Sequence, residues 1–391
     1  MHGITGMRRG LRNTALVAAA LTLCATVPAY ADSTTDTDPN SAPPSSTSLD
    51  CGNGVAAVTL TPAAGFDPLT ATDDELEANG LPTRPADAAD LPTWTGYVTA
   101  PRKATACPTE SADHTTGGPA VTEDIVTGAD GDANPDVDVD TPTLMIDPYS
   151  SDDDALGVDS SATGEQHSAN WAGNVATGHT YTWAHATWKV PRAYIPADDK
   201  EYFSSSWVGI GQGDSKSRPL AQDGSDSDGH NGVYSSYSIW WEMYPQNHAQ
   251  VVSHDVYFGD TIYSSVKLVT DKAWFSIMDE TSHEGGLYTY SSGSFGPDGT
   301  AEWIFERPSI DGYYPHLTYA TTTFTNAEAQ YGSSPVPLGH LTHYFSTMWN
   351  CKSASKTRLA YPGAINSAGT SFSTHSQNYG ARSKASGCTS W

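Results

Sequence analysis

Two glutamates stand four residues apart in the short stretch 301–306. If this stretch is a β-strand, side chains alternate between its faces, so Glu302 and Glu306 share one face with Ile304. At about 3.3 Å per residue their backbones lie about 13 Å apart. This separation is too wide for one carboxyl pair, so at most one of the two acts at a given reaction centre. A carboxylate on a strand can serve there as a general acid or base.

A second stretch, 234–244, combines aromatic side chains with one more acid. The same alternation places Trp240, Glu242 and Tyr244 on one face. The opposite face is hydrophobic and is expected to be core, with Ile239, Trp241 and Met243. Aromatic rings around a carboxylate are typical of a binding cleft. From the residues alone, two interpretations stay open: a catalytic cleft, and the carbohydrate-binding face of a non-catalytic, lectin-like sandwich.

Sequence motifs of several other enzyme classes are missing. The chain has no HExxH, no GxSxG and no GxxxxGK[ST]. It has no CxxC and no zinc-ligand spacing, so no metal and no other cofactor is expected. The alternating acids from Asp130 to Asp138 suggest a calcium loop, but Pro135 occupies the place of the turn glycine and Thr141 that of the bidentate glutamate. A solvated acidic linker is the favoured interpretation, and calcium binding is the alternative.

The part of the chain from residue 164 onward is expected to form many short strands. Alternating runs rich in Tyr, Trp, Val, Thr and Ser are separated by Gly, Asn, Asp and Pro turns. These runs are 180–190, 202–210, 233–244, 261–269, 272–279, 287–291 and 300–306. No long stretch has the period of an amphipathic helix. The pattern predicts an all-β fold, an antiparallel β-sandwich, and the 228 residues from 164 to 391 are enough for one such domain.

Four blocks follow one another in this region. They are SANWAG at 168–173, SWVGI at 206–210, IWWEMYP at 239–245 and AEWIFE at 301–306. In this order and at this spacing the chain resembles the glutamic peptidases, the eqolisin family, from about Ser168 to Asn326. The resemblance implies two packed, seven-stranded antiparallel sheets in a concanavalin-like arrangement. It also implies an endopeptidase that acts in acid on protein or peptide substrates.

The same resemblance implies a glutamine–glutamate dyad. The family glutamate is the second acid of the AEWIxE block, which is Glu306. The family glutamine lies in a Leu-Gln-x-Gly block that 219–224 matches with one residue inserted, which gives Gln222, with Gln212 as a poorer rival. In the implied mechanism Glu306 takes a proton from the attacking water, while the Gln222 amide donates to the developing oxyanion. The substrate-binding residues carried over by motif are Trp171, Trp207, Glu242, Tyr244 and Asp226.

Two positions depart from the family pattern. Gly211 stands where the family has an aspartate after Trp-Val-Gly-Ile. A family acid that precedes the Trp-Tyr-Glu segment by three residues is replaced near Ser238. Both substitutions leave the dyad in place but change the polar groups expected around it.

The charge of the 391-residue chain is strongly negative and unevenly spread. It carries 45 Asp and Glu against 19 Lys and Arg, for a formal net charge of -26. Such a surface repels phosphate backbones and anionic lipids, so neither nucleic acid nor a membrane is expected as a partner. Residues 32–163 hold 25 of the acids and only 3 of the bases. We expect 32–163 to be an acidic propeptide or N-terminal region of low order with a linker, and 164–391 to be the peptidase domain, acting as a monomer. Within the first region, 32–48 is expected to be disordered, 51–107 to form a small disulfide-tied unit, and 109–161 to be the acidic linker.

The first 31 residues read as a signal peptide. Three arginines precede an apolar stretch, 14–27, and a small-x-small cleavage pattern from Ala29 to Ala31. The apolar stretch is shorter than the roughly 20 residues that span a bilayer. The sequence therefore predicts a secreted, extracellular protein.

The cysteines agree with export. Cys24 is lost with the signal peptide, and an even number of cysteines in an exported chain implies two disulfides. Three pairings are possible. Cys51–Cys107 with Cys351–Cys388 is favoured, because each bridge then stays within one region.

Overall fold

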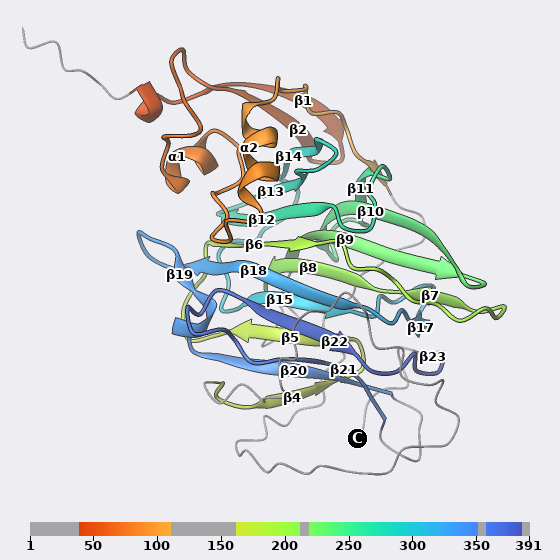
Figure 1. The fold of residues 1–391 in the computed structure, drawn as a ribbon. Helices are drawn as coiled ribbons and strands as arrows, with labels where there is room; N and C mark the ends of the chain where they lie inside the picture. The colour runs from red at the N-terminus through yellow and green to blue at the C-terminus, as the bar shows by residue number, and fades with distance from the viewer. Residues whose placement is uncertain (1–38, 111–161, 212–218, 351–356, 385–391) are drawn as a thin grey trace, which may run out of the picture. The chain divides into compact units, whose positions relative to one another are not determined.

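The computed structural model describes residues 39–110, 162–211, 219–350 and 357–384 (Figure 1). From Pro39 onward these residues belong to one unit. The signal peptide, the acidic loop 130–138, Gln212 and the Cys351–Cys388 pair lie outside the described residues, so the expectations about them stay predictions.

Strands dominate the described part of the chain, as the alternation predicts. The first are β1 (Ser45–Gly52), β2 (Val55–Thr61), β3 (Thr109–Glu110), β4 (Glu165–Ser168), β5 (Trp171–Ala176), β6 (Trp183–Lys189), β7 (Glu201–Phe203) and β8 (Ser205–Ile210). The next are β9 (Leu220–His230), β10 (Val233–Tyr244), β11 (Gln250–Ser253), β12 (Thr261–Val269), β13 (Lys272–Asp279), β14 (Glu284–Tyr290) and β15 (Ala301–Glu306). The last are β16 (Tyr313–Tyr314), β17 (His316–Leu317), β18 (Thr321–Gln330), β19 (Val336–Pro337), β20 (His343–Trp349), β21 (Arg358–Pro362), β22 (Phe372–Ser376) and β23 (Ser383–Lys384).

Helices are short and few among the described residues. The α-helices are α1 (Asp73–Ala78) and α2 (Leu91–Thr99), and the 3-10 turns are η1 (Pro39–Ser41) and η2 (Leu338–His340). A capping box begins α1, in which the Thr72 hydroxyl accepts from the Glu75 amide and the Glu75 carboxylate accepts from the Thr72 amide. None of the helices described here is long and apolar enough to cross a membrane.

The strands form two layers that share one strand. One layer runs β1-β2-β14-β13-β12-β6-β18. The other runs β11-β10-β9-β8-β15-β5-β20-β21-β22 and ends on β18, which is the shared strand. The first half of β18 pairs with β22 and the second half with β6, so the hydrogen-bonded ladders link 21 strands. The register of β18 breaks between Thr325 and Glu328, where Asn326 has a φ of 51°. The predicted count of seven strands in each sheet stays a prediction.

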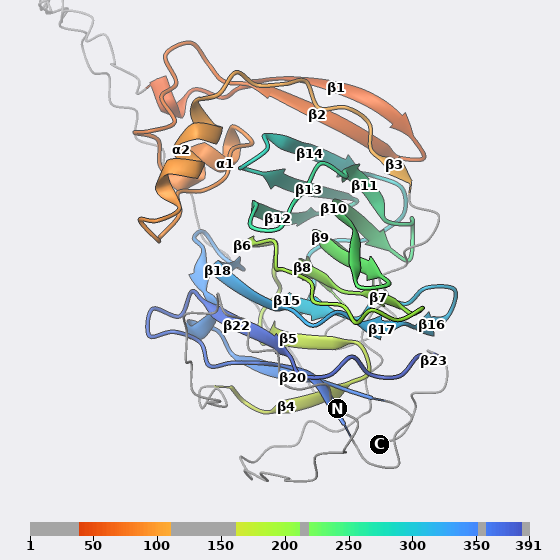
Figure 2. The same cartoon turned by 45° about the vertical axis from the view of Figure 1, so that its right-hand side comes forward.

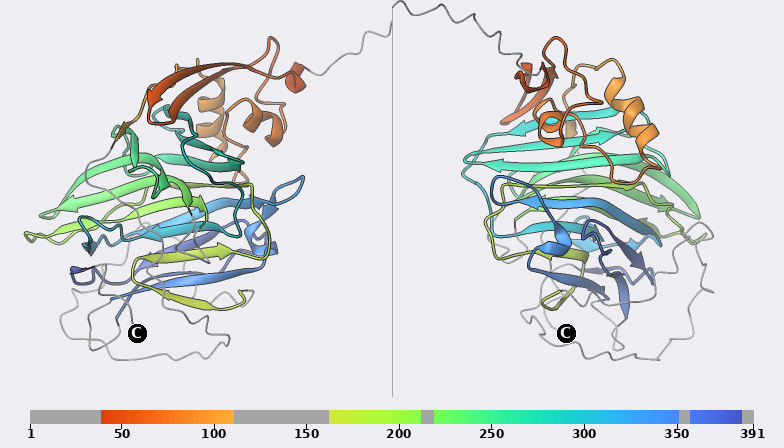
Figure 3. Two further views of the ribbon diagram at one scale, coloured as in Figure 1. Left: turned by 180° about the vertical axis from the view of Figure 1, so that it is seen from behind. Right: turned by 60° about the vertical axis from the view of Figure 1, so that its left-hand side comes forward.

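The main core lies between the two layers, where β12 packs against β8 and β9, and β13 against β9 and β10 (Figures 2 and 3). Ile239, Trp241 and Met243 point into this core, which confirms the face predicted from the alternation. The Trp241 ring stacks on Phe275 with 4.6 Å between centroids. Each large apolar side chain buried in this way contributes about 1.5–3 kcal/mol, so the core fixes which face of β10 turns outward.

The expected disorder of 32–48 is wrong for residues 39–48, which include η1 and the start of β1, whereas 51–107 is ordered and tied by a disulfide as expected. The hairpin β1–β2 turns through Asn53 and two glycines, all with positive φ, and its second strand pairs with β14. The predicted disulfide Cys51–Cys107 is confirmed, with 5.5 Å between Cα atoms. The acids that suggested disorder lie mostly on exposed turns and helix starts, while small apolar residues of β2 face inward. Charge and composition therefore misjudged only the start of this segment, residues 39–48.

Candidate active site

Five adjacent strands, β5, β15, β8, β9 and β10, present one shared face on the side opposite the main core. Cross-strand partners point the same way, so the register defines rows on this face. Glu306 pairs with Trp171 on β5 and with Ser205 on β8. Ser205 in turn pairs with Asp226 on β9, and Asp226 with Ser238 on β10. One row of this face thus joins a glutamate, a serine and an aspartate.

A second row lies four residues further along the same strands. Glu302 pairs with Gly209, Gly209 with Gln222, and Gln222 with Glu242. Between the two rows the face is apolar, with Ile304, Trp207 and Trp240 packed in one hydrophobic cluster. All the site residues predicted from the sequence therefore share this face: Trp171, Trp207, Gln222, Asp226, Glu242, Tyr244 and Glu306. The two dyad members stand in different rows.

Tyr244 connects the two rows electrostatically. Burial raises the pKa of its phenol, and the charges of Glu242 and Glu306 raise it further. Because sheets twist, diagonally opposite corners of one face can approach each other. The Tyr244 hydroxyl thus lies within electrostatic reach of both glutamates.

Glu306 is fully buried and held by two donors. The Asn170 amide donates to Oε1 at 3.0 Å, and the Trp207 indole donates to Oε2 at 2.7 Å. The pKa of Glu306 is raised to about 8: burial is the largest cause, hydrogen bonds from Trp207, Asn170 and Trp171 oppose it, and the charge of Asp226 adds to the rise. Trp171 packs edge-to-face on Trp207 at 5.0 Å, which fixes the indole that holds the carboxyl group. This carboxyl group has a defined orientation and is ready to hold or release a proton.

Gln222 is fully buried and paired with Glu242. Its amide nitrogen donates to Oε2 of Glu242 at 2.8 Å, and Glu242 is itself fully buried. A primary amide carries two N–H donors. The bond to Glu242 uses one donor and fixes the plane of the amide.

Asp226 explains one of the two departures from the family pattern. It accepts hydrogen bonds from the Ser205 hydroxyl at 2.5 Å, the Trp240 indole at 2.7 Å and the Ser238 hydroxyl at 3.3 Å. Ser238, which lies where an acid was expected, therefore supplies a donor to a carboxylate. An acid at that position would place a like charge beside Asp226, which is costly in a buried site.

Gly211 explains the other departure. Its φ is +115°, and a Cβ at this position would lie 2.2 Å from the carbonyl oxygen of Pro219. An aspartate cannot occupy this conformation without moving the backbone. The chain just beyond β8 thus requires glycine where the family pattern has an acid.

Three residues near Glu306 were given no role by the sequence. Asn170 lies in the SANWAG block, and its position beside Trp171 was the available signal. Burial raises the pKa of the Tyr314 phenol, and the charge of Glu306 raises it further. The fully buried Arg307 donates to the carbonyl oxygens of Tyr314, Pro315 and Ala381. Nothing in the spacing of residues 307–314 indicates that this loop folds back beside the site.

Two further buried acids lie on β9. Burial raises the pKa of Asp223 and of Asp228 well above the ordinary value, and the charge of Asp226 adds to the effect at Asp228. The Ser264 hydroxyl donates to Asp223. Within the described ranges no group of three His, Cys, Asp or Glu side chains could hold a metal ion.

Comparisons with known proteins identify the family. Residues 169–367 match the model of the Peptidase A4 family, which is more than half of the chain. The chain belongs to the Peptidase A4 family. The resemblance to the glutamic peptidases is thus confirmed, and the protein is a glutamic endopeptidase. This favours the catalytic interpretation of the aromatic face over the lectin-like one.

Individual relatives of this glutamic peptidase are distant. Aspergillopepsin-2 of Aspergillus niger is 29% identical over 195 residues, which cover 44% of this chain and 68% of that protein. Scytalido-glutamic peptidase with a peptide-based transition state analog is 20% identical with a TM-score of 0.44, covering 54% of this chain and 98% of that one. Aspergilloglutamic peptidase from Aspergillus niger is 26% identical with a TM-score of 0.38, covering 45% and 99%. Residues 39–110 lie outside the family match.

Proposed function

We propose that this glutamic endopeptidase is secreted, works in acid and hydrolyses peptide bonds in proteins through Glu306 and Gln222. The observation that carries the proposal is the fully buried Glu306 carboxyl group, held by Asn170 and Trp207 on the same sheet face as Gln222. Protein and peptide chains are the proposed partners, and the enzyme is proposed to act as a monomer.

Glu306 moves the protons in this mechanism. As a carboxylate it accepts a proton from water while the water oxygen attacks the scissile carbonyl carbon. The same proton then passes to the leaving nitrogen as the carbon–nitrogen bond breaks, which returns Glu306 to the carboxylate. Burial is the largest cause of its raised pKa. At pH 3–4 a carboxyl group with this raised pKa is protonated, so the proposed mechanism requires a lower pKa for Glu306 once water and a peptide occupy the face.

Gln222 stabilises the tetrahedral intermediate. The bond to Glu242 holds the orientation of this side chain, and we assign its amide group as the donor to the developing oxyanion. Because an amide does not titrate, this donor keeps its hydrogen in acid. Removing one such donor typically costs about 100–1000-fold in kcat.

The decisive experiment compares two variants of the purified enzyme with wild type on denatured casein at pH 3–4. Glu306→Gln is expected to abolish cleavage, and Gln222→Ala to lower kcat by about 100-fold or more. Glu201→Gln, an exposed glutamate on β7, serves as the matched control and should retain wild-type activity. Melting curves establish that each variant is folded. Full activity in both dyad variants would refute the assignment.

Export and processing need a separate measurement. We propose that residues 1–31 are removed on secretion and that the chain is processed within 32–163. N-terminal sequencing of the secreted protein locates each cut. A single mature start at Asp32, with no later cut, would contradict processing but not the dyad.

A further inference from the structure

The N-terminal segment 39–110, here called the N-terminal module, extends one layer of the sandwich. Strand β2 pairs antiparallel with β14, from Val58 opposite Leu287 to Val55 opposite Tyr290. The short β3 at the end of the module pairs with β11 in the other layer. Without the module, β14 would present an open sheet edge, which proteins normally cover.

The module also supplies residues to the main core of the sandwich. Val55 and Ala57 are 5% and 1% exposed, and they face the same side as their partners Tyr290 and Tyr288. All four belong to the core that includes Trp241 and Phe275. The hairpin is therefore part of the peptidase core, although it lies outside the family match.

Ion pairs join the module to β14 and to two further strands, β6 and β12. Lys103 binds Glu284 at 2.8 Å, Lys189 binds Asp90 at 2.8 Å, and Lys267 binds Glu77 at 3.2 Å. The lysines are about half exposed or more. Exposed ion pairs contribute little free energy, so these three pairs orient the module on the sandwich but add little to its binding. The apolar contacts of β2 carry the attachment, and these do not titrate.

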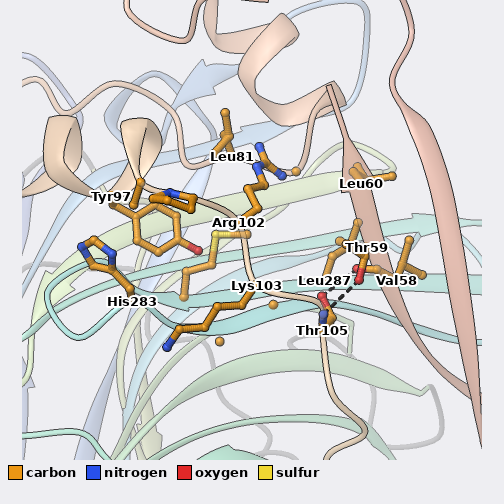
Figure 4. A pocket seen from close by; sticks show the side chains of 16 residues that line it. Val58, Thr59, Leu60, Leu81, Tyr97, Arg102, Lys103, Thr105, His283 and Leu287 are labelled. Atoms are coloured by element: carbon orange, nitrogen blue, oxygen red, sulfur yellow. Dashed lines mark hydrogen bonds between the residues drawn. The ribbon is translucent and has the colours of Figure 1, made fainter. Parts of the chain in front are cut away.

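A cavity of about 480 Å³ lies at this junction (Figure 4). Leu60, Leu81 and Tyr97 line it from the module, and His283 and Leu287 line it from the β13–β14 turn and from β14. Beside the cavity, Thr105 holds the last part of the module against β2. Its amide donates to the Thr59 hydroxyl at 2.9 Å, and its hydroxyl donates to the Val58 carbonyl at 2.8 Å. The junction is thus built from both parts.

The module also has a small hydrophobic core and a disulfide of its own. Leu76, Leu81, Trp94 and Val98 form a small core of their own, and the Trp94 indole donates to the Pro82 carbonyl at 3.0 Å. Its disulfide, Cys51–Cys107, begins and ends inside the module. The bridge therefore holds the module together without linking it to the sandwich.

We propose that the N-terminal module stays bound to the sandwich, as a second and non-covalently held chain, when the polypeptide is cut beyond Glu110. The strand pairing, the shared core and the closed internal bridge support this directly. The inference goes beyond the proposed dyad and does not depend on it. It predicts a two-chain mature enzyme, in place of the loss of the whole of 32–163.

Retention of the module is compatible with access to the active site. Strands β1 and β2 lie at the β14 edge of one layer, whereas Glu306 and Gln222 lie on the other layer (Figure 2). The site face is also the side of that layer that turns away from the main core. The module reaches the site layer through the pairing of β3 with β11, and the strands that carry Glu306 and Gln222 pair with other strands.

The test uses the full chain with a recognition sequence for a specific protease inserted between residues 110 and 162. After complete cutting, both fragments are expected to co-elute in size-exclusion chromatography at pH 4 and at pH 7. They should separate only in denaturant, with or without reductant. Elution of the module apart from a folded sandwich at either pH value would overturn the proposal. Because this test changes no residue of the core, misfolding of a variant cannot produce that result.

A matched pair of variants tests the attachment itself. Ala57→Asp places a charge in the shared core, and Leu49→Asp changes the residue directly opposite it on β1, which is 53% exposed. After cutting, Ala57→Asp should dissociate at a concentration at least tenfold higher than wild type, and Leu49→Asp should behave as wild type. Equal retention in both variants would refute the role of the core contact. Casein cleavage by the same samples reports on the dyad separately.

Discussion

At the residue scale, the site depends on how a buried carboxyl group is held. Glu306 has hydrogen bonds to both oxygens, from Asn170 and from Trp207. Burial raises its pKa and these donors lower it, so the balance sets the pH at which it can act as a base. Besides packing around Glu306, the Trp207 indole and the Asn170 amide are therefore expected to set the pH range in which the enzyme is active.

Trp207→Phe tests this tuning, because it keeps an aromatic ring beside Trp171 and removes only the donor to Glu306. A hydrogen bond to a charged group contributes about 1.5–3 kcal/mol, so the Glu306 pKa should rise by about one unit or more. The acid limb of the kcat/KM profile on a peptide substrate should move to higher pH by the same amount. Trp183→Phe, which changes a buried indole on β6 that stacks on His185, should leave the limb in place. An unmoved limb in Trp207→Phe would show that the indole only packs.

At the element scale, neighbouring strands of the site face must approach closely. Gly224 on β9 lies opposite Trp207 on β8, and a Cβ at Gly224 would lie 2.3 Å from the Ser206 carbonyl oxygen and 2.5 Å from the Trp207 Cβ. A real side chain there forces the two strands apart. The glycine is thus what allows the Trp207 ring to occupy the centre of the face.

Gly224→Ala should therefore lower stability by about 2–4 kcal/mol, in the range of overpacked or strained core positions. It should also reduce activity, because β8 carries the indole that holds Glu306. Gly96→Ala in α2 is the control, since a Cβ there meets nothing within 4 Å. This change should raise stability by about 0.5–1 kcal/mol. Urea unfolding monitored by tryptophan fluorescence measures both, and an unaltered midpoint for Gly224→Ala would contradict the close approach.

Period-two alternation predicted much of this arrangement from the sequence. It assigned Trp241 to the core and Glu242 to the site face, because in a strand the face of a residue depends only on local order. It did not predict that Glu306 shares a row with Asp226, while Gln222 shares one with Glu302. Such rows depend on the register between strands far apart in the chain. Docking of β2 on β14 was missed for the same reason.

At the scale of the whole molecule, several acids are buried with raised pKa values. Burial raises the pKa of Glu280 to about 8 and that of Asp260 to about 6, in addition to Glu306, Asp223 and Asp228. Asp90 of the N-terminal module and Asp279 raise the pKa of Glu280, and Lys189 lowers it. Unfolded carboxyl groups have ordinary values near 4, so the folded state binds these protons more tightly.

This tighter proton binding fixes the sign of the pH dependence. The stabilisation from such a group is complete below its unfolded value near pH 4, and it is lost as pH rises through the folded value of about 6 to 8. The net charge of -26 at pH 7 adds self-repulsion that falls away toward the isoelectric point of about 4.5.

Melting temperatures at constant ionic strength should therefore be highest near pH 4–5 and fall steadily to pH 8. Glu280→Gln, which removes one of these acids, should flatten this decline, whereas Glu201→Gln on the surface should not. Greatest stability at pH 8 would show that the buried acids do not keep their protons in the folded state. The proposed link between the acidic composition and an enzyme that works in acid would then be wrong.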